Sequence, residues 1–150
     1  MQTRAELSRA LDEIRRLVDE LRPPVLDELG MAGSIMQQRE QFPGIRIVME
    51  NDGVLHDLPA AVEVAAYRIV LEAVTNAARH SNAELVTVRL RRPQDLKIEI
   101  VDDGSNTTTW VAGVGITSMT DRATELGGTL TSGPIPTGGG RVSATFPVLA

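Results

Sequence analysis

The sequence predicts an α+β fold, a two-layer α/β sandwich in which one mixed sheet is covered on one face by helices and preceded by a further helix. Segments with helical and strand periodicity follow one another in the order helix, helix, strand, helix, strand, strand, helix, strand, strand. Neighbouring strands are joined by short turns, which disfavours a doubly wound parallel sheet. A chain of 150 residues is long enough to bury one core without metals or disulfides.

The composition narrows the class of protein. Cysteine is absent, so a disulfide framework, a thiol nucleophile and a zinc-thiolate site are excluded. A net charge of −5 disfavours nucleic acid as a partner, because that partner requires clustered Lys and Arg. No apolar run reaches the roughly 20 residues that cross a bilayer, and the N-terminal MQTRAELSRA does not resemble a signal peptide. We therefore expect a cytoplasmic domain.

The first two predicted helices lie before residue 40. Apolar residues at alternating spacings of four and three predict an amphipathic helix over residues 4–22, which Pro23 and Pro24 end. This seam consists of Leu7, Leu11, Ile14, Val18 and Leu21. About two and a half heptads do not distinguish a dimer helix from a helix that docks on its own domain. A second helix is predicted over Val25–Gln38, interrupted near Gly30 and Gly33.

The next predicted elements are a strand and the longest helix. Gly44–Glu50 alternates apolar and polar side chains, as a half-buried strand does. Leu58–Arg79 has helical periodicity with Pro59 at a tolerated early position. Its predicted buried face consists of Val62, Ala66, Ile69, Ala73 and Ala77.

The C-terminal part predicts a hairpin, a helix and two more strands. Ala83–Arg91 and Asp95–Val101 are alternating runs joined by a turn at residues 92–94. A helix from about Gly115 to Leu126 follows. Thr129–Ser132 and Val142–Phe146 are the last two predicted strands.

A polar stripe on the longest predicted helix is the first candidate site. Glu72, Asn76 and His80 recur every four residues beside Arg68 and Arg79. A solvated helix face would give the same pattern. Asparagine is a poor helix-interior residue, however, and its amide oxygen suits Mg²⁺, which takes few protein oxygens and completes its shell with phosphates and water.

Two glycine-containing segments are the other candidates. Asp102-Asp103-Gly104 directly follows an apolar strand, so it is either an ordinary turn or a pocket in which Asp102 accepts a hydrogen bond from an exocyclic amine. Gly113-Val114-Gly115-Ile116 opens a helix, where unpaired N–H groups favour phosphate oxygens. The run at residues 138–140 is most simply a flexible hairpin loop.

Together these segments resemble a known family. VLEAVTNAARHSNA, VDDG, GVGITSMTDRATELGG and TGGGRVSATFP resemble the N box, the two glycine boxes and the terminal strand of the histidine-kinase ATPase domain, whose superfamily includes gyrase, mismatch-repair and chaperone ATPases. IRRLVDELRPPVLDELGM resembles the end of the dimerisation helices and the linker in the subfamily of nitrate-sensing and lipid-fluidity-sensing kinases.

The resemblance implies roles for the helix stripe. Asn76 would ligate Mg²⁺, and Glu72 would position or deprotonate the group that attacks the γ-phosphate of ATP. Arg79 and His80 would contact phosphate or line the nucleotide pocket.

The resemblance also implies roles for the glycine boxes. Asp102 would read the adenine amine, with Gly104 shaping the turn beneath it. Gly113 and Gly115 would close a mobile lid and deliver backbone donors to the phosphates, and Ile116 would also belong to the nucleotide-binding residues.

Three departures from the family pattern are present. Asn106 stands where a second glycine is expected. Only the eight residues Ser105–Ala112, including Trp110, separate the two glycine boxes, so the lid is short. The threonine expected in the last strand is replaced by Gly140 or Arg141, depending on register. These departures predict a conventional metal-and-phosphate half and a lid that holds nucleotide loosely.

The predicted organisation is the C-terminal part of a dimerisation helix at residues 1–24, a linker helix at 25–40 and the ATPase domain at 41–150. The phosphoacceptor histidine of the family would lie upstream, since neither His56 nor His80 matches it. We therefore expect ATP binding without autophosphorylation. The expected partners are ATP, the kinase's own dimerisation and phosphoacceptor domain, and a response regulator receiver domain, with the longer kinase a homodimer that can be anchored in the cell membrane.

Two alternative functions remain at this point. The chain could be a degenerate nucleotide-binding module with a regulatory or dimerisation role, which the altered glycine boxes favour and the intact Glu72 and Asn76 disfavour. It could also be a serine kinase of the anti-sigma-factor type, which shares the ATPase fold but leaves the N-terminal helix seam unexplained.

Overall fold

The fold is described by a computed structural model that covers residues 3–20, 22–51, 55, 57–80, 82–104 and 114–148. Its element order is the predicted one, with one added 3₁₀ turn, Gln38–Gln41. The helices are α1 (Arg4–Glu20), α2 (Pro24–Gln37), α3 (Ala60–His80) and α4 (Val114–Glu125). The strands are β1 (Arg46–Asn51), β2 (Leu85–Arg91), β3 (Leu96–Asp102), β4 (Thr129–Pro134) and β5 (Gly140–Phe146).

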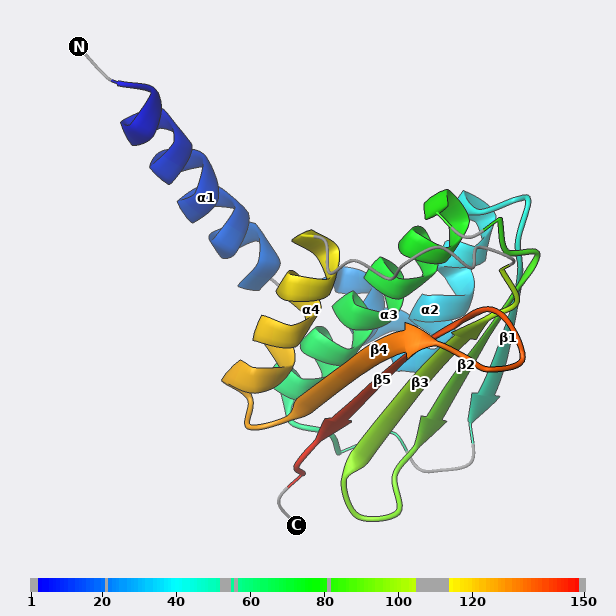
Figure 1. Cartoon of the computed structure of the whole chain (residues 1–150). Helices are drawn as coiled ribbons and strands as arrows, with labels where there is room; N and C mark the ends of the chain where they lie inside the picture. Colours follow the sequence, from blue (N-terminus) through cyan, green and yellow to red (C-terminus); the bar gives the residue numbers. More distant parts are fainter. Residues whose placement is uncertain are drawn as a thin grey trace.

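The five strands form one mixed sheet in the order β1-β2-β3-β5-β4. Strand β1 runs parallel to β2, and every other neighbouring pair is antiparallel. Helices α2, α3 and α4 lie on one face of the sheet, and α1 projects away from the body (Figure 1). The prediction of a two-layer α+β sandwich is therefore confirmed.

The core lies between α3 and the covered face of the sheet. All five apolar residues predicted on the inner face of this helix are at most 5% exposed. Alternate residues of the strands meet them, among them Val86, Val88 and Leu90 of β2 and Phe146 of β5. Each fully buried aliphatic or aromatic side chain contributes about 1.5–3 kcal/mol, so this interface supplies most of the stability.

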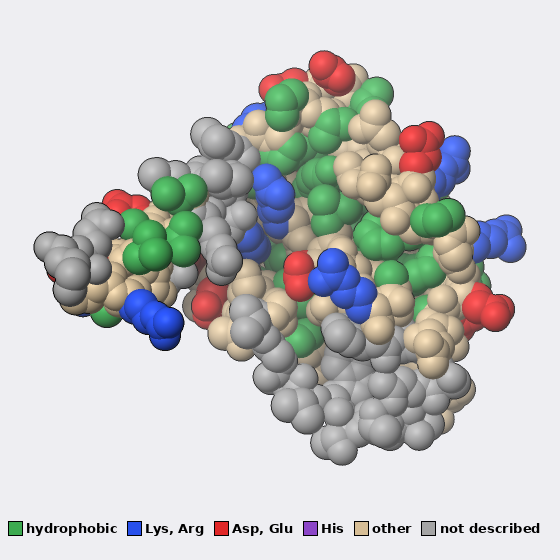
Figure 2. All heavy atoms as spheres, turned by 90° about the horizontal axis from the view of Figure 1, so that it is seen from above, with side chains coloured by type: hydrophobic (Ala, Val, Ile, Leu, Met, Phe, Trp, Pro, Cys, Tyr) green, Lys and Arg blue, Asp and Glu red, His purple; other side chains and the backbone are tan. Residues whose placement is uncertain are grey.

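Helix α1 leaves the first three residues of its predicted apolar seam uncovered. Leu7, Leu11 and Ile14 are about half exposed, at 52%, 49% and 55%. Figure 2 shows hydrophobic side chains on the arm at its left, which is α1. This part of the seam does not dock on its own domain, and no helix in the described part of the chain is long and apolar enough to cross a membrane.

Helix α2 follows the prediction with one correction. Gly30 has φ 71° and ψ 179°, and the helix kinks there as expected. Gly33 has regular helical backbone, so the predicted interruption at this residue is wrong. A glycine with φ below zero fits a helix interior at modest cost. Of Gly30 and Gly33, only Gly30 has a positive φ, which residues with a side chain rarely adopt. Beyond the kink, Met31 and Ile35 enter the core.

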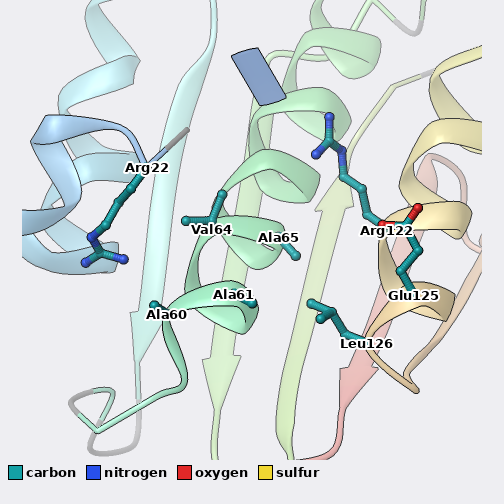
Figure 3. Close-up of a pocket in the computed structure, with 8 residues that line it drawn as sticks. All are labelled: Arg22, Ala60, Ala61, Val64, Ala65, Arg122, Glu125 and Leu126. Atoms are coloured by element: carbon teal, nitrogen blue, oxygen red, sulfur yellow. The ribbon is translucent and has the colours of Figure 1, made fainter. Parts of the chain in front are cut away.

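A shallow cleft of about 360 Å³ lies between the first turns of α3 and the last turn of α4. Ala61, Val64 and Leu126 line it, and Arg22 and Arg122 stand on its two sides (Figure 3). Arg22 donates to Asp27 at 2.7 Å and to Glu63 at 2.9 Å, which ties the segment before α2 to the start of α3. This cleft lies at the opposite end of α3 from Asn76.

Candidate nucleotide site

The end of α3, the end of β3 and the start of α4 meet at one end of the sandwich, the upper end in Figure 1. The carboxylate of Asp103, just after β3, accepts hydrogen bonds from the backbone of residues 84 and 85, just after α3. The start of α4 packs on α3 at Gly115. The three segments singled out for chemistry therefore converge.

Glu72 and Asn76 face the first turn of α4. Both side chains are half-buried, and a Cβ built on Gly115 would overlap the Glu72 carboxylate and lie 3.3 Å from the Asn76 amide nitrogen. Only a residue without a side chain allows this approach. The backbone N–H groups at the start of a helix have no intrahelical partners and can donate to an anion. This junction therefore places the side-chain oxygens of Glu72 and Asn76 beside N–H groups that can bind phosphate. Ile116 packs against the core below it.

The stripe on α3 also contains Arg79, His80 and Arg68. Arg79 is exposed, and the backbone of His80 ends α3 while its side chain lies outside the described residues. One turn before Glu72, the Nε atom of Arg68 is buried and has no hydrogen-bond partner in the described part of the chain. Such a donor is costly unless water or a ligand satisfies it.

Asp102 ends β3 with its side chain buried, at 9% exposure. Its Oδ1 atom accepts a hydrogen bond of 2.8 Å from the backbone N–H of Gly104, which is also buried. This bond across two residues is an Asx turn, and it fixes the orientation of the carboxylate. A carboxylate accepts several hydrogen bonds, so Asp102 retains capacity for a ligand amine.

The register of β5 decides whether Gly140 or Arg141 lies beside Asp102. Gly140 pairs directly with Asp102, whereas Arg141 pairs with Val101 and is exposed. Gly140 is therefore the residue directly beside Asp102 in the ladder, and it supplies no side-chain hydroxyl there.

Two residues near Asp102 were not assigned a role from the sequence. Asp103 accepts hydrogen bonds from Glu84 N–H at 2.8 Å and Leu85 N–H at 2.9 Å. Gly139 has φ +87°, and a Cβ built on it would overlap the carbonyl oxygen of Asp102. The acidic pair in VDDG hinted at Asp103, but the approach of Gly139 depends on the pairing of distant strands.

Magnesium binding and a lid over the nucleotide were also predicted for this site. Among the described residues, no group of three or more His, Cys, Asp or Glu could hold a metal ion. Mg²⁺ in nucleotide sites needs only one or two protein oxygens, and the amide oxygen of Asn76 could be one of them. Gly113, Asn106 and Trp110 lie outside the described residues.

Comparison with known proteins identifies the family. Residues 61–150, more than half of the chain, match the family described as histidine kinase-, DNA gyrase B-, and HSP90-like ATPase. The chain belongs to this ATPase family. The resemblance read from the four motifs is confirmed.

Relatives of this ATPase domain include sensor kinases. It is 28% identical over 142 residues to the sensor histidine kinase YxjM of Bacillus subtilis, covering 93% of this chain and 35% of the relative. It is 32% identical over 148 residues to the signal transduction histidine-protein kinase/phosphatase UhpB of Salmonella typhimurium, covering 91% of this chain and 28% of the relative. The chain thus spans about a third of the length of these proteins.

Solved structures share the fold of this ATPase domain. The histidine kinase domain of the blue-light activated kinase EL346 of Erythrobacter litoralis matches with a TM-score of 0.64 at 20% identity, covering 79% of this chain and 59% of that one. The ATP binding domain of PrrB from Mycobacterium tuberculosis matches with a TM-score of 0.61 at 22% identity, covering 84% and 95%.

Replacing Gly115 with alanine tests the junction of α3 and α4. The added methyl would push the Glu72 carboxylate and the Asn76 amide away from the helix start. We expect the free energy of unfolding to change by less than about 1 kcal/mol, because alanine favours the helix and a carboxylate end can turn aside. The Mg²⁺-dependent affinity for nucleotide should fall severalfold in calorimetry. Gly133→Ala is the matched control, since nothing lies within 4 Å of its Cβ.

Asp103 gives the stability of the domain an acid-dependent component. Hydrogen bonds from the backbone N–H groups, that of Leu85 first, lower the pKa of this carboxyl below its ordinary value of 3.8, although partial burial opposes them. Its ionised form therefore stabilises the fold at neutral pH, and this contribution is lost as the pH falls through the lowered pKa. Urea unfolding should show a difference in unfolding free energy between the wild type and Asp103→Asn that is steady down to about pH 5 and narrows below about pH 4.

Proposed function

We propose that this chain is the ATP-binding catalytic domain of a sensor histidine kinase. In this proposal, it transfers the γ-phosphate of ATP to a histidine outside the present sequence, from which the phosphate passes to a response regulator. The main support is the family match over residues 61–150 together with the convergence of the Asp102 turn and the Glu72–Asn76 face at one end of the fold. The names of YxjM and UhpB support the sensor-kinase role.

The base-binding half of the proposed site is centred on Asp102. Its buried carboxylate, held through Oδ1 by the Gly104 N–H, would accept a hydrogen bond from the exocyclic amine of adenine. Burying a carboxylate is costly without partners, and the ligand amine adds one. A base that presents a carbonyl at this position would meet acceptor against acceptor, so the geometry supports selectivity for adenine.

The phosphate half is formed by α3 and the start of α4. The amide oxygen of Asn76 would hold Mg²⁺, which would neutralise charge on the phosphate oxygens when bound. The N–H groups at the start of α4 would bind phosphate oxygens. Glu72, beside both, would orient or deprotonate the attacking imidazole nitrogen. Phosphoryl transfer depends on positioning and charge neutralisation, which these groups supply.

The longer protein is part of the proposal. Residues 1–24 would be the end of a dimerisation helix, 25–40 a linker helix and 41–150 the ATPase domain. The exposed part of the α1 seam supports this division, since the half-exposed Leu7, Leu11 and Ile14, at alternating spacings of four and three, suit a helical partner. The full-length kinase would be a homodimer with its sensor region elsewhere, and this domain would operate in the cytoplasm.

The alternatives have weaker support. A serine kinase of the anti-sigma-factor type would not explain α1, and the named relatives are histidine kinases. A degenerate module would be expected to lose the carboxylate and amide at the phosphate end, yet Glu72 and Asn76 both face the start of α4.

Calorimetric titration with a non-hydrolysable ATP analogue and Mg²⁺ tests the proposal. We expect saturable binding at one site per chain, stronger with Mg²⁺ than with a chelator. A protein with a cooperative unfolding transition that stays silent up to millimolar nucleotide would contradict the proposal and favour the degenerate module. Labelled ATP should leave no phosphohistidine on this chain alone, and a stable phosphoramidate on His56 or His80 would contradict the placement of the acceptor.

A further inference from the structure

The peptide that joins Asp102 to Asp103 is held from two sides. Strand β3 lies between β2 and β5 in the sheet. On the β2 side, the Asp103 carboxylate accepts from the N–H groups of Glu84 and Leu85, and the Asp103 N–H donates to the Leu85 carbonyl at 3.1 Å. Three hydrogen bonds therefore tie the residue after Asp102 to the start of β2.

On the β5 side, Gly139 contacts the same peptide. Because Gly139 has no side chain, its Cα can approach the Asp102 carbonyl closely. A Cβ on Gly139 would lie 3.0 Å from the Asp102 carbonyl carbon and 3.3 Å from the Asp103 Cα. The turn that carries it is closed by hydrogen bonds from Ile135 N–H to the Gly139 carbonyl at 3.0 Å and from Gly138 N–H to the Ile135 carbonyl at 2.9 Å. The next residue, Gly140, pairs with Asp102 in the ladder.

We propose that Asp103 and Gly139 are positioning residues that hold the Asp102–Asp103 peptide from its two sides and thereby fix the direction of the Asp102 carboxylate. The inference rests on the proposed function, since the carboxylate is the group that would read the base. Asp102 accepts from Gly104 only two residues further along, so any shift of this peptide also moves the Asx turn. A displacement of about 1 Å is enough to spoil a directed hydrogen bond.

Four variants separate positioning from general stability. Asp103→Ala removes the carboxylate, whereas Asp103→Asn keeps an oxygen that can accept from the same two N–H groups. Gly139→Ala places a methyl against Asp102, whereas Gly138→Ala introduces the same kind of strain, at φ +102°, with nothing within 4 Å of its Cβ. Each disruptive variant therefore has a partner that leaves the Asp102 peptide in place.

The first measurement is affinity for non-hydrolysable analogues of ATP and GTP. We expect Asp103→Ala and Gly139→Ala to weaken binding of the ATP analogue about tenfold and to reduce the preference for adenine over guanine. Asp103→Asn should recover most of both, and Gly138→Ala should keep the wild-type preference although it lowers the melting temperature. If all four variants lose stability while the base preference stays at the wild-type value, the positioning role is wrong.

The second measurement is hydrogen exchange of the Gly104 amide without nucleotide. We expect faster exchange in Asp103→Ala and Gly139→Ala than in the wild type, Asp103→Asn and Gly138→Ala, because the bond to Asp102 Oδ1 is lost. This readout separates the two proposals. If the wild type binds no nucleotide, the proposed function is contradicted, while the expected exchange pattern would still support the positioning role of Asp103 and Gly139. Equal exchange of the Gly104 amide in the wild type and all four variants would overturn that positioning role alone.

Discussion

Asp102→Asn is expected to lower the affinity for the ATP analogue by roughly 10- to 100-fold while the fold remains intact. Asp102 is 9% exposed, and its carboxylate accepts from the Gly104 N–H at 2.8 Å. Asparagine keeps an oxygen for Gly104, so the amide nitrogen turns toward the position of the adenine amine, where donor meets donor. Loss of a buried hydrogen bond to a charged group costs about 1.5–3 kcal/mol, which gives that fold-change.

The same variant predicts a change in base preference. The substitution should weaken binding of an analogue with a carbonyl in place of the adenine amine, such as an inosine nucleotide, less than it weakens binding of the adenine analogue. It can even strengthen binding of the inosine nucleotide, because the carbonyl oxygen accepts a hydrogen bond from the new amide N–H. Calorimetry with both nucleotides measures this ratio, and the melting temperature checks the fold. Equal weakening of both nucleotides, with an unchanged melting temperature, would show that Asp102 does not read the base.

Asn76→Ala is expected to remove the Mg²⁺-dependent part of nucleotide binding, a loss of about tenfold or more. The Asn76 amide lies beside Glu72 at the start of α4, where metal-bound phosphates would sit. Alanine favours a helix interior more than asparagine does, so α3 should be stabilised slightly. If the nucleotide affinity falls while the protein stays stable, Asn76 acts as a metal ligand and not only as a structural residue.

The control for Asn76 is built into the measurement. In the presence of a chelator, the wild type and Asn76→Ala should bind nucleotide equally, since no metal is present to be held. Thr75→Ala is the neighbouring comparison, because the Thr75 hydroxyl donates to the Leu71 carbonyl within the helix at 2.8 Å and is not part of the stripe. A similar loss in both variants, or a loss that persists with the chelator, would refute the metal-ligand role.

Much of the fold could be predicted from the sequence because the information is local. The residues of α3 that face the core recur at helical spacing, and all five predicted members are buried. The turn between β2 and β3 follows from two alternating runs around Pro93, and the pair is antiparallel as predicted. Periodicity depends only on neighbouring residues, so it can be read without knowing what each element packs against.

The candidate site could be predicted only in part. The stripe of Glu72 and Asn76 follows from a spacing of four, but its junction with Gly115 requires α4 to pack beside α3. Gly139 resembled an ordinary loop glycine, and only its contact with Asp102 distinguishes it from Gly138. Both contacts join segments distant in the chain, which local patterns do not specify.

By itself, the sequence determined the type and order of the elements, the buried face of the longest helix and the motifs of the ATPase family. The tertiary structure decided the strand order β1-β2-β3-β5-β4, the pairing of Asp102 with Gly140, the regular helix at Gly33 and the exposure of Leu7, Leu11 and Ile14 on α1. The physical reason is that a side-chain period is fixed by the backbone of one element, whereas register and burial are fixed by which elements pack together.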